Sequence, residues 1–229
     1  MRDGGVRAVG LLVPAARRVQ ERLATCVRES NDLVLPPRTV CGLDVSYQGE
    51  TAIGGAVLLS YPDLKRVSQT VASCKVTVPY IPTFLSFREY PPLSLAYGSL
   101  LCKPDVCFVD AHGRSHPRRM GAASHFGVLR DVPTIGVAKG ILCGRPRPGA
   151  YAWQALVDGE QIIGAEVITK LGAKPIYVSV GHRITLETAV QLTQGCTTDH
   201  RLPEPIRLAH SLVTETKRKM TASKCEEKF

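Results

Sequence analysis

The sequence predicts an α/β fold with a mixed central sheet, made of three antiparallel strands and then parallel strands, flanked by helices. Three consecutive segments rich in β-branched residues are separated by turn sequences. The part of the chain that follows alternates helical stretches with short apolar runs typical of buried strands. Because 229 residues fit one ordinary domain, we expect a single domain with a short basic tail at about residues 217–229.

The predicted elements begin with an amphipathic helix over residues 15–28. Val19, Leu23 and Val27 recur at every fourth position, so we expect this apolar stripe to pack against the rest of the protein. After a connector with two prolines, an antiparallel meander is predicted, with turns that contain glycine or proline. Its three strands cover residues 39–47, 52–60 and 67–78.

Helices and strands then alternate. A helical stretch over residues 85–101 is interrupted by Pro91 and Pro92, and the apolar run at residues 106–109 ends in Asp110. The remaining predicted elements are helices at residues 122–129, 186–194 and 205–219 and strands at residues 134–138, 162–169 and 176–180. An antiparallel three-strand start followed by parallel crossovers is the arrangement of ribonuclease H-like folds, which by itself does not identify a function.

The charge of the chain narrows the choice of partners. A formal net charge of +9 and a pI near 9.3 favour phosphate backbones or anionic surfaces. Part of the excess lies in Lys217, Arg218 and Lys219. No apolar run approaches the roughly 18 residues that a membrane helix requires. We therefore expect a nucleic-acid partner and no membrane.

The cysteines and the N-terminus bear on the compartment. The eight cysteines lie mostly in apolar surroundings and include no CxxC pair, which favours reduced thiols over disulfides or a structural zinc site. Arg2 and Arg7 precede an apolar stretch that resembles a short signal peptide, but Asp3 interrupts the basic region and the stretch continues into the first helix. We expect an intracellular protein in the cytoplasm, the nucleus or both.

Three acidic residues form the main candidate site. Asp44 lies between apolar residues of a strand, where a lone carboxylate is costly unless it is paired, and Asp110 ends a strand, where open α/β sheets present their ligands. Either acid alone could cap a turn or pair with an arginine. Glu89 adds a third carboxylate, and such clusters suit Mg²⁺ or Mn²⁺. One or two such ions can promote hydrolysis of a phosphodiester.

The segment DAHGRSHPRRMG is a second candidate feature. His112 and His116 have the spacing of zinc ligands on a helix, so a zinc hydrolase is an alternative. Gly113 and Pro117 argue against a helix there. Flexible glycines together with arginines favour a loop that holds nucleic acid.

Tyr80 is a third candidate, because it stands between Pro79 and Pro82 in VPYIPTF. The prolines stiffen the backbone and could present the ring, with Ile81, as a wedge that separates stacked bases. The alternative is an ordinary turn between a strand and a helix, with a packed tyrosine.

Six long motifs occur in an order that resembles the endonuclease V family. They are VCGLDVSY, VPYIPTFLSFREYPPL, KPDVCFVDAHGRSHPRRMGAASHFGV, PTIGVAKGILCG, PIYVSVGHRI and RLPEPIRLAH, and they cover most of residues 39–210. The resemblance implies a ribonuclease H-like fold that flips inosine into a pocket. It also implies cleavage of the second phosphodiester bond on the 3′ side of the inosine, which leaves 3′-hydroxyl and 5′-phosphate ends.

Residue roles follow from the same resemblance. Asp44 and Asp110 would hold Mg²⁺, with Mn²⁺ as a substitute, and Glu89 would contribute to the site directly or through water. His210 of the LAH motif would position a metal-bound water, and Lys139 of GVAKG would support the scissile or adjacent phosphate.

The resemblance also implies how the base is held. Tyr80, with Pro79, Ile81 and Pro82, matches the strand-separating wedge of the family. The residues that match the base pocket are Leu85, Gly113, His116, Gly121, Gly136 and Leu142. One departure is Thr83, where family members commonly have glycine, and it leaves the backbone conformation beside the base open.

The main alternative is a non-catalytic inosine-binding protein. Such a protein would have no physical need for three carboxylates together with His210 and Lys139. The partner is expected to be single- or double-stranded nucleic acid containing inosine, bound by a monomer. The frequent cysteines and the Lys-rich tail favour RNA slightly over DNA, although 2′-hydroxyl contacts decide that choice and cannot be read from one chain.

Overall fold

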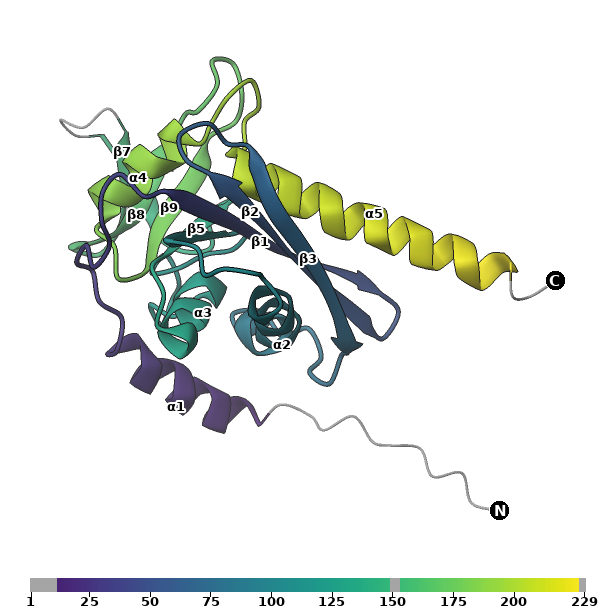
Figure 1. Ribbon diagram of the computed structural model, residues 1–229. Coiled ribbons are helices and arrows are strands. Elements are labelled where there is room, and N and C mark those ends of the chain that lie inside the picture. The colour runs from purple at the N-terminus through teal and green to yellow at the C-terminus, as the bar shows by residue number, and fades with distance from the viewer. Residues whose placement is uncertain (1–11, 149–152, 227–229) are drawn as a thin grey trace.

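The computed structural model describes residues 12–148 and 153–226, with side chains as far as residue 222. Within these residues one mixed sheet has the strand order β3-β2-β1-β4-β5-β9-β8-β7-β6. Figure 1 shows α5 on one face of this sheet and α2 and α3 on the other. The predicted α/β fold with a mixed sheet flanked by helices is therefore confirmed.

The first part of the sheet follows the prediction closely. Strands β1 (Thr39–Gln48), β2 (Thr51–Ser60) and β3 (Arg66–Lys75) form the antiparallel meander. β4 (Val106–Val109) pairs in parallel with β1, and β5 (Thr134–Ala138) pairs in parallel with β4. Because these three strands run parallel, the carboxyl ends of β1, β4 and β5 lie at the same end of the sheet.

The strands beyond β5 pair in antiparallel fashion, which adds a second antiparallel part to the predicted mixed sheet. β9 (Ile176–His182) pairs antiparallel with β5, and β8 (Gln161–Val167) continues the same pattern. The sequence did not predict β7 (Gln154–Asp158) and β6 (Arg145–Arg147). β6 is only three residues long and contains a proline, so it carries too little periodicity to be recognised.

Both faces of the central strands are buried under helices. Helices α4 (Leu186–Gly195) and α5 (Glu204–Glu226) cover one face, where Phe108 packs in the larger core. Helices α2 (Leu85–Gly98) and α3 (Ala122–Arg130) cover the other, where Cys107 and Val109 pack with Phe126. Burial on both faces explains why the sequences of β4 and β5 are continuous apolar runs.

The predicted packing face of the first helix was wrong at Val19, whereas Val27 of the same stripe packs against the core. Helix α1 spans Val13–Ala24, and Val19 on its expected inner stripe is 42% exposed. Ala16 and the polar Gln20 are buried instead. The polar side is inward because Gln20 donates hydrogen bonds to two backbone carbonyls, a demand that apolar periodicity cannot reveal.

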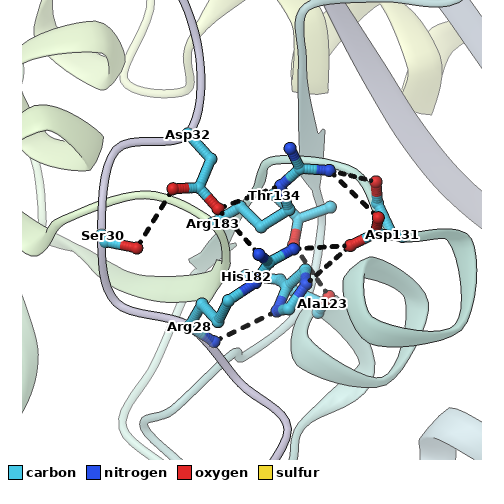
Figure 2. Close-up of polar contacts among 8 residues, drawn as sticks. All are labelled: Arg28, Ser30, Asp32, Ala123, Asp131, Thr134, His182 and Arg183. Atoms are coloured by element: carbon cyan, nitrogen blue, oxygen red, sulfur yellow. Dashed lines mark hydrogen bonds and ion pairs between the residues drawn. The ribbon is translucent and has the colours of Figure 1, made fainter.

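A polar network holds the connector that follows α1. The backbone N–H of Arg28 donates to Nδ1 of His182 at 3.2 Å, and Nε2 of His182 lies 3.3 Å from Oδ1 of Asp131 at the end of α3. Arg183 donates to the carbonyl of Asp131 and pairs with Asp32 (Figure 2). This network ties the connector to β9 and to α3, and so fixes the C-terminal end of α1.

Some boundaries differ from the prediction. α2 continues through Pro91 and Pro92 and ends at Gly98, and α5 extends to Glu226, so most of the expected basic tail is helical. Arg2 and Arg7 lie outside the described residues. Within the described parts of the chain, every helix is too short or too polar to cross a bilayer.

Candidate active site

Asp44 and Asp110 meet because their strands run side by side. Leu43 and Val109 are partners in the parallel pairing of β1 with β4, and each aspartate directly follows one of them. The backbone N–H of Asp110 donates to the carbonyl of Leu43 at 3.1 Å, which fixes the two strand ends together. Both carboxylates therefore lie at the same point of the sheet.

His210 joins these acids from helix α5. Its Nδ1 atom lies 2.8 Å from Oδ2 of Asp44, and its side chain is 55% exposed. The helix can approach because β1 has glycine at position 42, where an added Cβ would lie 1.8 Å from the carbonyl oxygen of Pro205. Close packing of α5 on β1 thus places the imidazole over Asp44.

The three side chains form a possible cation site. One ligand atom from each of Asp44, Asp110 and His210 lies within 4.8 Å of the others. Two carboxylates and an imidazole are donors that Mg²⁺ and Mn²⁺ accept. The donor set therefore fits the divalent cation expected for the site.

Glu89 on α2 is close enough for the charges of Asp44 and Asp110 to act on it, but among the described residues it is not part of the compact set of ligand atoms. Burial raises the pKa of Glu89 to about 8, and the charges of Asp44 and Asp110 add to this rise. Burial likewise raises the pKa of Asp44 to about 6, with the charge of Asp110 second and the hydrogen bond from His210 acting in the opposite direction. Crowded, partly desolvated carboxylates of this kind are stabilised by a bound cation.

Lys139 supplies a positive charge beside the acids. It follows the last residue of β5, and its Nζ contacts Oδ2 of Asp110 at 2.5 Å. The guanidinium of Arg201 donates to the carbonyl of Lys139 at 3.0 Å, which fixes the backbone there. The ammonium is partly exposed and can face an anionic ligand as well as Asp110.

A pocket of about 260 Å³ opens beside the acids. Asp110 and Lys139 line it, so it adjoins the cation site directly. Of the residues matched to wedge and pocket, five contribute to its lining: Tyr80, Leu85, His116, Gly121 and Leu142. The sequence did not predict Gln20 and Met120, which also line it; the position of Gln20 depends on how α1 packs.

Gly113 and Gly136 lie behind the pocket lining. A Cβ added to Gly136 would lie 2.5 Å from the backbone nitrogen of Gly113 and 2.7 Å from the carbonyl oxygen of Ala111. Gly136 allows the loop after β4 to cross β5 at backbone contact distance, and Gly113 allows the same loop to approach Val180 of β9. They shape the pocket by bringing this loop close to the sheet.

Tyr80 stands at the rim of the pocket and is 66% exposed. It is therefore not a packed turn residue. Pro79, Ile81 and Pro82 form the rest of this segment and are absent from the pocket lining within the described residues. The wedge role of the segment remains a prediction.

His112 and His116 have separate partners. Nδ1 of His112 lies 2.9 Å from the hydroxyl of Ser115. Nε2 of His116 lies 3.0 Å from the carbonyl of Thr83, and burial lowers the pKa of His116 to about 4. The segment is a loop of turns and bends and not a helix, so the two rings do not take up the arrangement of helical zinc ligands.

The structure shows the backbone conformation of Thr83, which the sequence left open. Its φ is 68°, in the left-handed region that glycine adopts most easily. The backbone beside the pocket therefore has a glycine-like conformation although the residue is threonine.

Comparison with known proteins agrees with this geometry. The sequence model of the Endonuclease V family matches residues 21–211. The chain is 44% identical over 203 residues to the Endonuclease V of Roseiflexus castenholzii (strain DSM 13941 / HLO8), over 87% of this chain and 91% of that protein. The crystal structure of the Endonuclease V of Streptomyces avermitilis is 38% identical with a TM-score of 0.83, over 91% of this chain and 94% of that one.

A third similar structure contains nucleic acid. The Endonuclease V of Ciona intestinalis, in complex with a 24mer DNA containing an inosine followed by a ribo-adenosine, is 33% identical with a TM-score of 0.83. That match covers 91% of this chain and 98% of the other. Together with the acidic site on the mixed sheet, these similarities define the protein as a nuclease that cuts within a strand. The chain belongs to the endonuclease V family.

Proposed function

We propose that this endonuclease depends on a divalent metal ion and cuts nucleic acid next to inosine. Asp44 and Asp110 would hold Mg²⁺, with Mn²⁺ as a substitute, and Glu89 would contribute directly or through water. The compact set of Asp44, Asp110 and His210 ligand atoms supports this assignment. When bound, the ion would stabilise negative charge on the phosphate and activate water for attack.

Side chains around the acids would orient the water, take up its proton and neutralise phosphate charge. An ionised Asp44 accepts a hydrogen bond from Nδ1–H of His210, which leaves Nε2 of the neutral ring with a lone pair that can orient water and take up its proton. Lys139 would neutralise charge on the scissile or adjacent phosphate while its contact with Asp110 keeps it in place.

The observation that carries the substrate proposal is the position of the pocket. Asp110 and Lys139 belong both to its lining and to the acidic site. A base flipped into the pocket would therefore bring its own backbone beside the acids. The bound DNA of the Ciona intestinalis protein, with its inosine, supports hypoxanthine as that base.

The position of the cut and the sugar are finer proposals. We infer cleavage at the second phosphodiester bond 3′ to inosine, leaving 3′-hydroxyl and 5′-phosphate ends, from the resemblance of the six motifs. We favour RNA slightly over DNA, which the ribo-adenosine after the inosine in the Ciona intestinalis complex supports. The protein would act as a monomer on single- or double-stranded substrates, in the cytoplasm, the nucleus or both.

Mapping the products on matched oligonucleotides tests the proposal. End-labelled RNA and DNA strands would carry inosine, guanosine or adenosine at one position and be otherwise identical. We expect one cut, at the second bond 3′ to inosine, with faster cutting of RNA. Binding of the inosine strand without any cut would support a non-catalytic inosine-binding protein instead. Equal cutting of all three bases would contradict inosine recognition.

A further inference from the structure

The segment that carries Tyr80 is held at both of its ends. Before it, Nη1 of Arg88 donates to the carbonyl of Val78 at 3.0 Å. After it, Thr83 has a φ of 68°, a conformation that a β-branched side chain rarely adopts. A threonine stays in this conformation only if its surroundings hold it there.

Three side chains converge on the carbonyl oxygen of Thr83. Nε2 of Gln20 lies at 3.0 Å and Nε2 of His116 at 3.0 Å. Nη2 of Arg118 donates to the same oxygen at 2.8 Å and also to the hydroxyl of Thr83 at 2.6 Å. His116 accepts at Nδ1 from the backbone N–H of Arg118, so Nε2 carries its proton and is a donor.

Gln20 lies at the centre of this arrangement. Its side chain is fully buried, and its Oε1 accepts from Nε of Arg118 at 2.6 Å. Its Nε2 also donates to the carbonyl of Met120 at 3.2 Å. Thr83 and Met120 belong to two different segments that both line the pocket. The side-chain amide of Gln20 therefore connects two walls of the pocket.

Helix α1 is in a suitable position to act as a brace. The network of Arg28 and His182 fixes the connector after it (Figure 2). Arg118 also stacks over the ring of Phe84, 4.3 Å from its centroid, at the residue after Thr83. The donors are therefore themselves fixed and can hold the turn.

We propose that Gln20 of helix α1 and Arg118 of the loop after β4 are positioning residues that together brace the rim of the base pocket. By holding Thr83 in the left-handed conformation, they keep Tyr80 and Leu85 facing one pocket. This inference deepens the proposed function and rests on it for the nature of the ligand. It also explains how this chain tolerates a threonine where a glycine would need no support.

The first test replaces Gln20 with a side chain of similar length and no polar end. Gln20→Met should raise the KM for an inosine oligonucleotide about tenfold, more than it lowers the rate at saturation, because a misplaced pocket weakens base capture before chemistry. Arg118→Lys should act in the same direction, since lysine lacks the planar fork. Val19→Ala, on the exposed face of the same helix, is the matched control and should match the wild type.

The second test uses the conformational preference of glycine. Thr83→Gly should restore most of the KM lost in Gln20→Met, because glycine adopts a positive φ without a brace. Thr83→Ala in the same background should not restore it. An unchanged KM in both Gln20→Met and Arg118→Lys would overturn the inference. Failure of Thr83→Gly to restore KM would also overturn it, because Gln20 would then have only a general structural role.

A readout without substrate separates this inference from the proposed function. The backbone N–H of Phe84 donates to the carbonyl of Ile81 at 3.0 Å, so its hydrogen exchange reports whether the turn opens. Exchange should be at least about tenfold faster in Gln20→Met than in the wild type and Val19→Ala. Unchanged exchange would refute the brace even in a protein that cuts inosine. The wild type could instead leave inosine strands uncut while hydrogen exchange at Phe84 is still faster in Gln20→Met. That result would refute only the proposed function.

Discussion

Nδ1 of His210 lies 2.8 Å from Oδ2 of Asp44, although the two residues are 166 positions apart in the chain. An ionised carboxylate only accepts hydrogen bonds, so this contact fixes the proton on Nδ1 and leaves Nε2 as an acceptor. The imidazole is thereby oriented as a metal-ligating or water-orienting histidine would be.

Replacement of His210 by alanine should lower the single-turnover rate by about 10²–10⁴, the range for loss of a positioned base, with little change in substrate affinity. Single-turnover cleavage at several substrate concentrations measures both quantities. Ser211→Ala is the matched control, because its hydroxyl donates within α5, to the carbonyl of Arg207. A large loss of affinity with an unchanged rate at saturation would mean that His210 acts in binding alone.

Gly42→Ala should separate α5 from β1. An added Cβ would lie 1.8 Å from the carbonyl oxygen of Pro205, and backbone cannot yield as a flexible side chain would. We expect a loss of stability of about 1–3 kcal/mol or more and a loss of cleavage, because His210 moves away from Asp44. Denaturant unfolding and cleavage assays measure the two effects. Gly98→Ala, whose added Cβ would meet Arg130 at an ordinary 3.6 Å, should behave like the wild type, and equal behaviour of both variants would contradict the close packing.

Tyr80→Ala should weaken substrate binding by about tenfold to hundredfold, because stacking of a base on an aromatic ring contributes roughly 1–3 kcal/mol. The loss should be larger for structured substrates than for flexible single strands, whose bases are already unstacked. Tyr80→Phe keeps the ring and should retain most of the affinity. Binding titrations on both substrate types provide the measurement. Small, equal losses would remove the wedge role.

The contribution of His125 to stability should fall as the pH falls from about 6.5 to 4. Burial lowers the pKa of His125 to about 4, and the ring packs against Phe87 and Tyr90. Because the unfolded chain takes up a proton near pH 6.5, the neutral buried ring stabilises the fold fully above that pH and progressively less below it. His125→Phe should reduce the loss of unfolding free energy between pH 7 and pH 4.5 by about 2–3 kcal/mol.

Denaturant unfolding at the two pH values measures this difference. An equal pH dependence in His125→Phe and in the wild type would show that His125 does not titrate with unfolding.

The sequence predicted those parts of the fold and site that depend on local pattern. The β-branched meander and the buried runs located β1 to β5, and an acid inside or at the end of such a strand indicated Asp44 and Asp110. Parallel pairing of β1 with β4 then brings those two acids together. That pairing and its register are findings of the structure, since the sequence did not specify which strands are neighbours.

Features that depend on tertiary packing could not be predicted in this way. The amphipathic stripe of α1 indicated Val19 as an inward residue, but the helix buries Gln20, because carbonyls of distant loops require a donor there. The conformation of Thr83 is likewise set by Arg118, Gln20 and His116, and threonine alone would predict an ordinary φ.

Asp44 and Asp110 are proposed to hold the divalent ion on which cleavage depends. The most direct measurement follows cutting of an inosine oligonucleotide by chelator-treated protein as Mg²⁺ is added back, for the wild type, Asp110→Asn and the exposed turn control Asp63→Asn. We expect no cutting without metal, recovery with Mg²⁺ or Mn²⁺ in the wild type and control, and a rate at least about a hundredfold lower in a folded Asp110→Asn. Full activity in chelator, recovery with Zn²⁺ alone, or cutting by Asp110→Asn within about tenfold of the wild type would contradict the claim.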